Sequence, residues 1–271
     1  MQRVPSDSMA AEMFLDHFGV SPRAAPDLEG LESILAEFSR IPWENLTKFL
    51  VKAEGLRGQS RLRSPETVIR KHIEDGTGGT CFSLTEALAA VLRRAGYRCG
   101  PVMADMSHGK NIHCGLIVAV PDTGTFLADP GYLVPFPVPL RSGVGARLSL
   151  PGQELEWRPC GEGVFDLYTA EEGRSIWRYR LRTGPVGRSE FLGHWQESFD
   201  ATGMNSLHAN LRVDSGRIYA HNMNLRRTEG GGKFNEKLRE DYAARMETFF
   251  GISSRIAKAA QEEWRRSCLN R

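Results

Sequence analysis

The sequence GTGGTCFSLTEALAAVL, residues 76–92, places a cysteine between a glycine-rich turn and a run of apolar residues. The apolar residues after Cys81 recur at helical spacing, so we expect a largely buried helix that ends near Gly96. The N-terminus of a helix favours thiolate over thiol, which makes Cys81 a candidate nucleophile. Gly78 and Gly79 allow close approach of the backbone and are candidates for part of an oxyanion hole. From this stretch alone, a buried structural cysteine is an equally good interpretation.

Upstream of this stretch the sequence predicts helices. Apolar residues within 28–38 recur at helical spacing, which is typical of a helix with one buried face. A second helix is indicated by Ser64 as its N-cap, Pro65 at its first position and Gly76 beyond its end. We therefore expect residues 1–96 to form a helical subdomain that carries the nucleophile.

Downstream, the pattern changes to short β-like runs separated by Pro, Gly and Asp clusters. The runs are residues 102–106, 112–120, 126–128 and 176–181. We expect an antiparallel, barrel-like β subdomain over residues 97–200. Residues 121–124 have the composition of a hairpin loop, which would put His113 and Asp129 on adjacent antiparallel strands.

The last segment, residues 201–271, is expected to form a C-terminal α/β subdomain that acts as a lid. A hairpin turning at Asp214-Ser215-Gly216 precedes an amphipathic helix from about Asn235 to Phe250. The chain as a whole is therefore predicted to be an α+β protein with three subregions in one compact unit.

Composition excludes several classes of protein. The 271 residues contain 35 Lys and Arg against 33 Asp and Glu, a formal charge of +2, which is too small to indicate a nucleic-acid partner. The N-terminal sequence MQRVPSDSM lacks the apolar core of a secretory signal, and the longest apolar run, residues 116–120, is too short to cross a membrane. We expect a cytoplasmic protein that does not bind membranes.

The cysteines indicate free thiols. There are five, an odd number without a C-x-x-C pair: Cys81, Cys99, Cys114, Cys160 and Cys268. This pattern favours neither a disulfide framework nor a zinc site, so no metal is expected.

His113 and Asp129 are the candidate partners of the thiol. His113 begins an apolar strand, and on its own a structural histidine is the simpler interpretation. Asp129 follows the next strand, where a carboxylate within reach of the imidazole would fix its tautomer and stabilise its cation. An imidazolium would in turn lower the pKa of Cys81. An Asp before Pro-Gly is also a common turn former, so Asp129 alone would not indicate catalysis.

These segments together resemble the arylamine N-acetyltransferases, which carry a Cys-His-Asp triad in this order on a papain- or transglutaminase-like core. The matching segments are Ile41-Pro42-Trp43-Glu44-Asn45-Leu46, Gly78-Gly79-Thr80-Cys81-Phe82, His113-Cys114-Gly115-Leu116-Ile117-Val118, Asp129-Pro130-Gly131-Tyr132, Pro137-Val138-Pro139-Leu140 and Phe249-Phe250-Gly251-Ile252. The matches keep their order from about residue 9 to residue 252. The resemblance implies Cys81, His113 and Asp129 as nucleophile, base and orienting carboxylate.

The resemblance also implies the reaction. Cys81 would take an acyl group from a thioester such as acetyl-CoA, and a small-molecule amine would then accept it in a ping-pong cycle. The thioester is a co-substrate, so no bound cofactor is expected. Phe82, Tyr132 and Phe136 flank the triad segments and are the expected aromatic walls of the substrate pocket.

Three positions depart from the family pattern. The family usually has Arg four residues before the cysteine, and Glu and Asn two and four residues after it, whereas this chain has Thr77, Ser83 and Thr85. The change removes an expected partner of Glu44, and shorter side chains beside the nucleophile predict a preference for a bulkier or differently delivered acyl donor. The alternative is ordinary specificity, with the missing charge supplied by Arg61, Arg63 or Arg70.

The same residues are compatible with other functions. An amide synthase of the same family would take its acyl group from an acyl carrier protein or a natural-product thioester. A cysteine peptidase or transglutaminase-like enzyme would use the same triad. A scaffold that has lost its activity is a further alternative, against which stands the intact triad.

Overall fold

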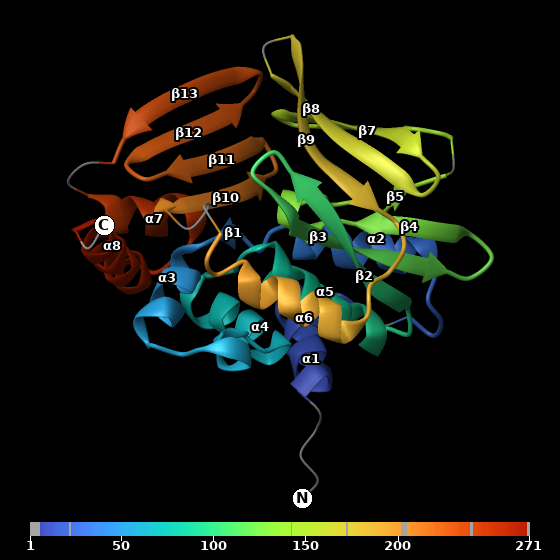
Figure 1. Ribbon diagram of the computed structural model, residues 1–271, viewed down its shortest axis with the longest axis horizontal. Coiled ribbons are helices and arrows are strands. Elements are labelled where there is room, and N and C mark those ends of the chain that lie inside the picture. Colours follow the sequence, from blue (N-terminus) through green and yellow to red (C-terminus); the bar gives the residue numbers. More distant parts are fainter. Residues whose placement is uncertain are drawn as a thin grey trace, which may run out of the picture.

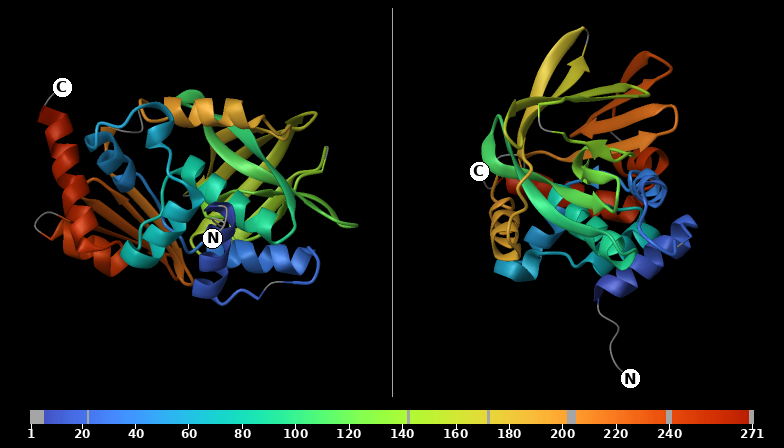
Figure 2. Two further views of the ribbon diagram at one scale, coloured as in Figure 1. Left: turned by 90° about the horizontal axis from the view of Figure 1, so that it is seen from below. Right: turned by 90° about the vertical axis from the view of Figure 1, so that its right-hand side faces the viewer.

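The computed structural model describes residues 6–21, 23–141, 143–171, 173–201, 205–238 and 241–269. Within these ranges the chain forms an α+β fold with eight α-helices and two antiparallel sheets, one of eight strands and one of five. Figure 1 shows the N-terminal helices as a lower layer, with the two sheets side by side above it. In Figure 2 the left view, from below, shows the N-terminal helices in front of the sheets, and the right view shows the sheets above these helices. The expected α+β class with a barrel-like central sheet is confirmed.

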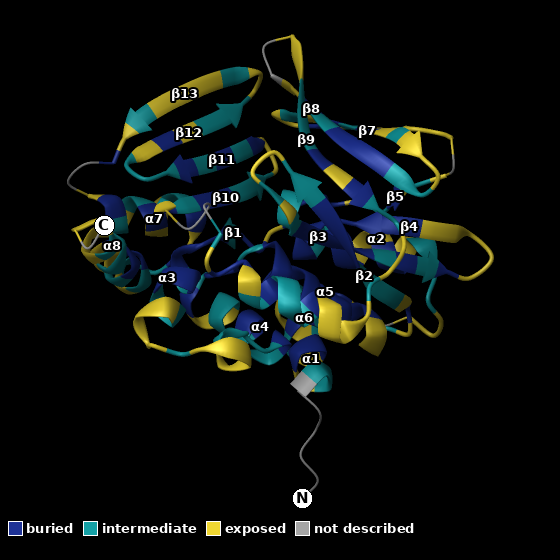
Figure 3. Ribbon diagram, viewed as in Figure 1, coloured by how far each residue is buried: buried dark blue, intermediate teal, exposed yellow. Residues whose placement is uncertain are grey.

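The N-terminal helices form where caps and apolar spacing predict them. They are α1 (Ser6–Phe18), α2 (Leu28–Phe38), α3 (Leu46–Ala53), α4 (Pro65–Asp75) and α5 (Cys81–Arg94). Ser64 caps α4 by accepting a hydrogen bond from the backbone N–H of Thr67 at 3.1 Å, and Gly76 ends the helix with a left-handed φ of 68°. Helix α5 is buried over most of its length, as Figure 3 shows, because α1, α2, α4 and two strands of the larger sheet, Arg98–Met106 and Gly109–Val120, pack around it.

The larger sheet has the strand order β5-β4-β3-β2-β9-β8-β7-β6. Its strands are β2 (Arg98–Met106), β3 (Gly109–Val120), β4 (Gly124–Ala128), β5 (Val138–Pro139), β6 (Ala146–Leu150), β7 (Gln153–Gly161), β8 (Val164–Glu171) and β9 (Arg174–Arg182). The predicted loop at residues 121–124 joins β3 to β4, which pair antiparallel with Leu116 opposite Ala128. The pairing puts His113 and Asp129 on neighbouring segments, as predicted. The sequence patterns do not predict β6, β7 and β8.

The smaller sheet has the order β1-β10-β11-β12-β13. Its strands are β1 (Trp43–Glu44), β10 (His208–Val213), β11 (Gly216–His221), β12 (Asn224–Glu229) and β13 (Gly232–Lys237). The predicted turn at Asp214-Ser215-Gly216 joins β10 to β11. Helices α7 (Tyr242–Phe250) and α8 (Ser254–Leu269) pack with α3 and this sheet around a separate apolar core. Strand β1 brings the N-terminal helices into direct contact with the C-terminal sheet.

The helix expected from Asn235 to Phe250 is wrong at its start, because α7 begins only at Tyr242. Gly230 and Gly231 take left-handed φ angles of 56° and 79° in the turn between β12 and β13. This turn reverses the chain, so Asn235 lies in β13 and its strand satisfies the backbone by pairing with β12.

Two short 3₁₀ turns and one further helix complete the architecture near the nucleophile. The turns are Gly58–Arg61 and Pro130–Tyr132, and the helix is α6 (Arg188–Glu197). Helix α6 contributes Phe191 and Trp195 to the apolar cluster that surrounds Cys81. Over the described ranges, no helix is both long and apolar enough to cross a membrane.

Replacing Gly76 with alanine should destabilise the protein more than the same change at Gly19. Both glycines have left-handed φ angles, 68° and 65°, so both substitutions carry a backbone cost of about 1 kcal/mol. At Gly76 the new Cβ would also lie 1.9 Å from the carbonyl oxygen of Gly251, whereas nothing lies within 4 Å at Gly19. Urea unfolding should show a loss of roughly 3 kcal/mol or more for Gly76→Ala. Equal losses for the two variants would mean that the contact between the ends of α4 and α7 does not constrain the fold.

Candidate active site

Cys81 is the first residue of α5 and is only 7% exposed. The turn before it lies against Pro42: a Cβ added to Gly78 would lie 1.8 Å from the Pro42 carbonyl oxygen, and the N–H of Gly79 donates to that oxygen at 3.4 Å. Neither glycine lines the cavity next to the thiol. Gly78 and Gly79 therefore fix the turn that presents Cys81, and the structure does not bring them to the thiol as hydrogen-bond donors.

His113, on β3, and Asp129, directly after β4, form a buried hydrogen-bonded pair. Nε2 of His113 donates to Oδ2 of Asp129 at 3.1 Å. The carboxylate also accepts the backbone N–H of Tyr132 at 3.1 Å and the hydroxyl of Tyr179 at 2.8 Å. These three hydrogen bonds offset the free-energy cost of removing the carboxylate from water.

Tyr179 and Trp157 support this pair from β9 and β7. The ring of Tyr179 stacks on the imidazole of His113, with centroids 4.7 Å apart and an interplanar angle of 21°. The Tyr179 oxygen accepts a hydrogen bond from Nε1 of Trp157 at 2.9 Å while its hydroxyl donates to Asp129. Sequence reasoning missed both residues; the only signal was the position of Tyr179 in a predicted strand.

Gly131 lies next to the side chains of both Cys81 and His113. A Cβ built on Gly131 would lie 2.8 Å from Cβ of Cys81, 2.7 Å from Cε1 of His113 and 3.3 Å from its Nδ1. The two distances to carbon atoms are shorter than those that real Cβ atoms make. Only glycine fits between the two side chains, and Nδ1, the imidazole nitrogen not used by Asp129, lies on the side of the thiol.

The electrostatics of the site favour a thiolate beside an imidazolium. A hydrogen bond with the Cys114 thiol lowers the pKa of Cys81, burial raises it, and the hydrogen bond and charge of His113 lower it again, so that it lies well below its usual range. Burial alone would lower the pKa of His113, but the charge and hydrogen bond of Asp129, with Cys81, raise it to about 10. Burial and the neighbouring Cys81 raise the pKa of Cys114 well above its usual range. Of these two thiols, Cys81 is the one that loses its proton more readily.

The three positions that depart from the family pattern lie behind the turn and the helix. Each hydroxyl donates to a backbone carbonyl: Thr77 to Lys71 at 3.2 Å, Ser83 to Thr80 at 3.0 Å and Thr85 to Cys114 at 3.4 Å. None of Thr77, Ser83 and Thr85 is among the residues that line the cavity. These short side chains therefore do not enlarge the space beside the nucleophile.

Arg63 supplies a positive charge close to Glu44. Its Nη1 donates to the carbonyl of Gly78 at 2.6 Å and to Oγ1 of Thr47 at 3.1 Å, and that hydroxyl donates to the Glu44 carboxylate at 2.8 Å. Burial raises the pKa of the Glu44 carboxyl, and the charge of Arg63 opposes this rise. Thr77 carries no charge, and Arg63 supplies the positive charge beside Glu44 and the turn.

A cavity of about 570 Å³ lies next to Cys81, between the two sheets and the helices. Cys81, His113, Phe82 and Tyr132 are among the residues that line it. Phe136 is not: it is 45% exposed and lines a separate hollow. The structure therefore brings two of the three expected aromatic walls to the cavity and does not bring the third.

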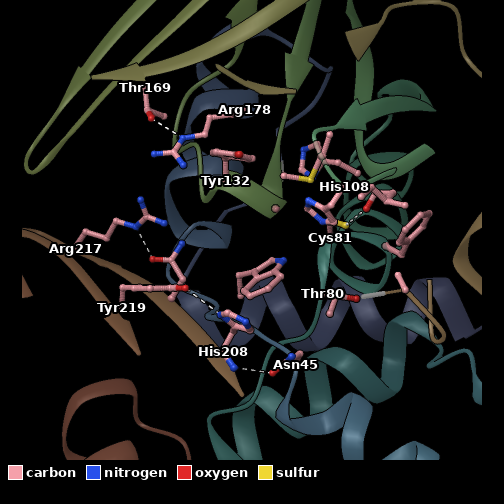
Figure 4. Close-up of a pocket in the computed structure, with 18 of the residues that line it drawn as sticks. Asn45, Thr80, Cys81, His108, Tyr132, Thr169, Arg178, His208, Arg217 and Tyr219 are labelled. Atoms are coloured by element: carbon pink, nitrogen blue, oxygen red, sulfur yellow. Dashed lines mark hydrogen bonds between the residues drawn. The ribbon is translucent and has the colours of Figure 1, made fainter. Parts of the chain in front are cut away.

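Polar and cationic side chains line much of the cavity. Figure 4 shows Cys81, His108 and Tyr132 on one side and Arg217, Tyr219 and His208 across from them. The cationic residues in the lining are Lys48, Arg178, Arg217, Arg226 and Lys233. In the described part of the chain, no group of three or more His, Cys, Asp or Glu side chains is placed to hold a metal ion. The cavity has the size of a site for an organic ligand, and its cations suit one with anionic groups.

Both a protein-family model and solved structures match this chain. A family model described as N-acetyltransferase matches residues 27–258. None of the curated proteins compared with the chain matches it. Several solved structures share its fold across nearly their whole length.

These structures are arylamine N-acetyltransferases. The Mycobacterium marinum enzyme in complex with CoA is 19% identical, with a TM-score of 0.77 and coverage of 93% of this chain and 98% of that chain. The Salmonella typhimurium enzyme is 16% identical, with a TM-score of 0.76 and coverage of 93% and 98%. The Bacillus cereus enzyme, described as having a unique Cys-His-Glu catalytic triad, is 16% identical, with a TM-score of 0.72 and coverage of 90% and 98%. At these identities the likeness shows the fold.

Iodoacetamide should alkylate Cys81 faster than the other four cysteines near neutral pH, because the thiolate is the reactive form. Burial is the first cause that raises the pKa of Cys99, Cys114 and Cys160, which leaves these thiols protonated. Peptide mass spectrometry after a short exposure measures the labelling of each cysteine. Equal labelling at Cys99 or Cys268 would contradict a specially activated Cys81.

Gly131→Ala should slow the alkylation of Cys81 by about tenfold or more, since the new methyl group must separate the thiol from the imidazole. Gly184→Ala is the matched control, because nothing lies within 4 Å of a Cβ at Gly184. Both rates are measured on folded protein at the same pH. An unchanged rate in Gly131→Ala would show that His113 does not activate the thiol.

Proposed function

Because the chain belongs to the arylamine N-acetyltransferase family, whose model matches residues 27–258, we propose that it transfers an acyl group from a thioester to an amine through a covalent intermediate on Cys81. The observation that carries this proposal is the buried Cys81 at a helix N-terminus, facing an imidazole that is hydrogen-bonded to a buried carboxylate. In the proposal His113 moves the protons, and Asp129 orients the imidazole and stabilises its cation.

In the first half-reaction the thiolate of Cys81 attacks the carbonyl carbon of the donor. A bond forms to the Cys81 sulfur, the bond to the donor's sulfur breaks, and the leaving thiolate takes a proton from the His113 imidazolium. The first N–H groups of α5 have no partner within the helix, and we assign the developing oxyanion to them. Gly78 and Gly79 contribute by setting the turn that starts the helix.

In the second half-reaction the amine nitrogen attacks the acyl carbon. His113 accepts the proton that the nitrogen loses, and Cys81 leaves as a thiolate, so the resting ion pair is restored. The carboxylate of Asp129, held by the donors already described, stabilises the imidazolium as it forms again. An amide is more stable than a thioester, which makes this step favourable.

Coenzyme A is the donor that the cavity favours. Five Lys and Arg side chains in the lining suit the phosphate groups of CoA. The similar Mycobacterium marinum structure contains CoA, which favours CoA over an acyl carrier protein as the source of the acyl group. The co-substrate enters and leaves with each turnover, and the proposal needs no resident cofactor.

Acetyl is the acyl group that we propose. The expected preference for a bulkier donor depended on space left by Thr77, Ser83 and Thr85, none of which lines the cavity. Arg63 also supplies the charge near Glu44 that the departure at position 77 had removed. Both observations favour the ordinary specificity of the family.

Intact-protein mass spectrometry after incubation with acetyl-CoA should show one added acetyl group, lost again when a simple aniline is added. Cys81→Ala should give no adduct. Asp129→Asn should form the adduct at least about a hundredfold more slowly, because the amide holds the imidazole in the wrong tautomer and cannot stabilise its cation.

The same experiment with longer acyl-CoAs, acyl carrier thioesters and water as acceptor separates the alternatives. Faster labelling by a longer donor or by an acyl carrier thioester would overturn the assignment of acetyl-CoA. Loss of the adduct in water as fast as with aniline would indicate a hydrolase. An adduct on the Cys81→Ala variant would remove the covalent mechanism.

A further inference from the structure

Lys48 is a buried cation of the cavity wall that the proposed mechanism does not use. It lies on α3, is 7% exposed and lines the same cavity as Cys81. Its Nζ donates to the carbonyl of Ser198 at 2.6 Å and to the hydroxyl of Ser198 at 2.8 Å. The ammonium also lies 4.5 Å from the ring centroid of Phe199, which belongs to the apolar cluster around Cys81. The position of this charge is therefore fixed by contacts on two sides.

No carboxylate pairs with this ammonium in the part of the chain that the structure describes. Asp200 is the carboxylate whose charge reaches Lys48, but it is 70% exposed and lies 3.7 Å from each of Lys52 and Arg61. A buried ammonium without a paired anion costs free energy. Consistent with this, burial lowers the pKa of Lys48 to about 8.

The nucleophile Cys81 lies close enough for its charge to affect Lys48: both residues line the cavity, and Phe199 contacts the ammonium and belongs to the buried cluster of Cys81. After burial, the charge of Cys81 has the largest effect on the pKa of Lys48 and raises it; Lys52 lowers it, and Asp200 and Cys114 raise it. The effect is mutual, since the charge of Lys48 contributes to the lowered pKa of Cys81. The groups that affect Lys48 lie on α3, α5 and β3 and in the segment after α6.

We propose that Lys48 is a positioning residue for the reaction: its ammonium, fixed by Ser198 in the wall of the same cavity, stabilises the thiolate of Cys81. The proposal rests on the proposed role of Cys81 as nucleophile. In this proposal two cations, the ammonium of Lys48 and the imidazolium of His113, stabilise the thiolate that attacks the acyl donor.

A purely structural role for Lys48 makes a different prediction. In that case its two hydrogen bonds to Ser198 would serve only to tie α3 to the end of α6, and a neutral donor would do as well. The Ser198 hydroxyl itself donates to the carbonyl of Trp195 at 2.6 Å, so part of this end is held without Lys48. Glutamine can keep a hydrogen bond to Ser198 without the charge, whereas arginine keeps the charge.

The test is the rate of alkylation of Cys81 by iodoacetamide as a function of pH in Lys48→Met, Lys48→Gln and Lys48→Arg. In the Met and Gln variants the midpoint of the profile should rise by about one pH unit, and the rate below the midpoint should fall about tenfold. Lys48→Arg should stay close to the wild-type profile. Lys52→Met, on the same helix and 38% exposed at its side chain, is the matched control and should leave the profile unchanged.

A Gln variant with the wild-type profile would overturn the proposal, whatever the Met variant does, because glutamine keeps a hydrogen-bond donor and removes the charge. A shift of equal size in Lys52→Met would overturn it as well. Thermal unfolding shows that each variant is folded, and if Lys48→Met fails to fold, the comparison of Gln with Arg still decides. The assay reads the thiol and not acyl transfer, so it gives its answer even if the search for an acetyl adduct fails.

Discussion

The site depends on one buried negative charge, the carboxylate of Asp129, which is 1% exposed. Removing a carboxylate from water costs on the order of several kcal/mol, and here three donors offset that cost: the imidazole of His113, the hydroxyl of Tyr179 and the N–H of Tyr132. The donors come from β3, β9 and the turn after β4, so the sheet must close around the carboxylate before all three reach it. The carboxylate raises the pKa of His113, and His113 lowers the pKa of Cys81.

Local sequence signals were sufficient for the parts of the site that lie within one segment. The helix start at Cys81 and the adjacency of His113 and Asp129 follow from a glycine-rich turn and a short hairpin. The contacts of Tyr179 and Lys48 could not be predicted, because they join residues 50 and 150 positions apart. The strands within residues 146–171 were missed because charged residues and Pro and Gly interrupt their apolar positions.

The departures from the family pattern show that one residue can make an interaction that is lost when a residue elsewhere in the chain is replaced. Thr77 stands where the family has an arginine, yet Arg63 carries a guanidinium to the same turn from 15 residues away from Gly78. The physical requirement is a positive charge and a donor beside Glu44 and the turn, and the chain can meet it from either position. A single sequence shows which residue occupies a position, but it does not show which side chains from other segments lie next to that position in the fold.

The pairing of β1 with β10 joins Trp43 to Asn210 and Glu44 to Ala209. During synthesis on the ribosome, the thiol, the imidazole and the carboxylate emerge with roughly the first half of the chain, whereas Tyr179 and β10 emerge much later. A partly made chain thus has Cys81 without the complete set of donors on Asp129 and without the far wall of the cavity. The hydrogen bond from Tyr179 and the cavity wall formed by β10 can therefore join Cys81, His113 and Asp129 only late in translation.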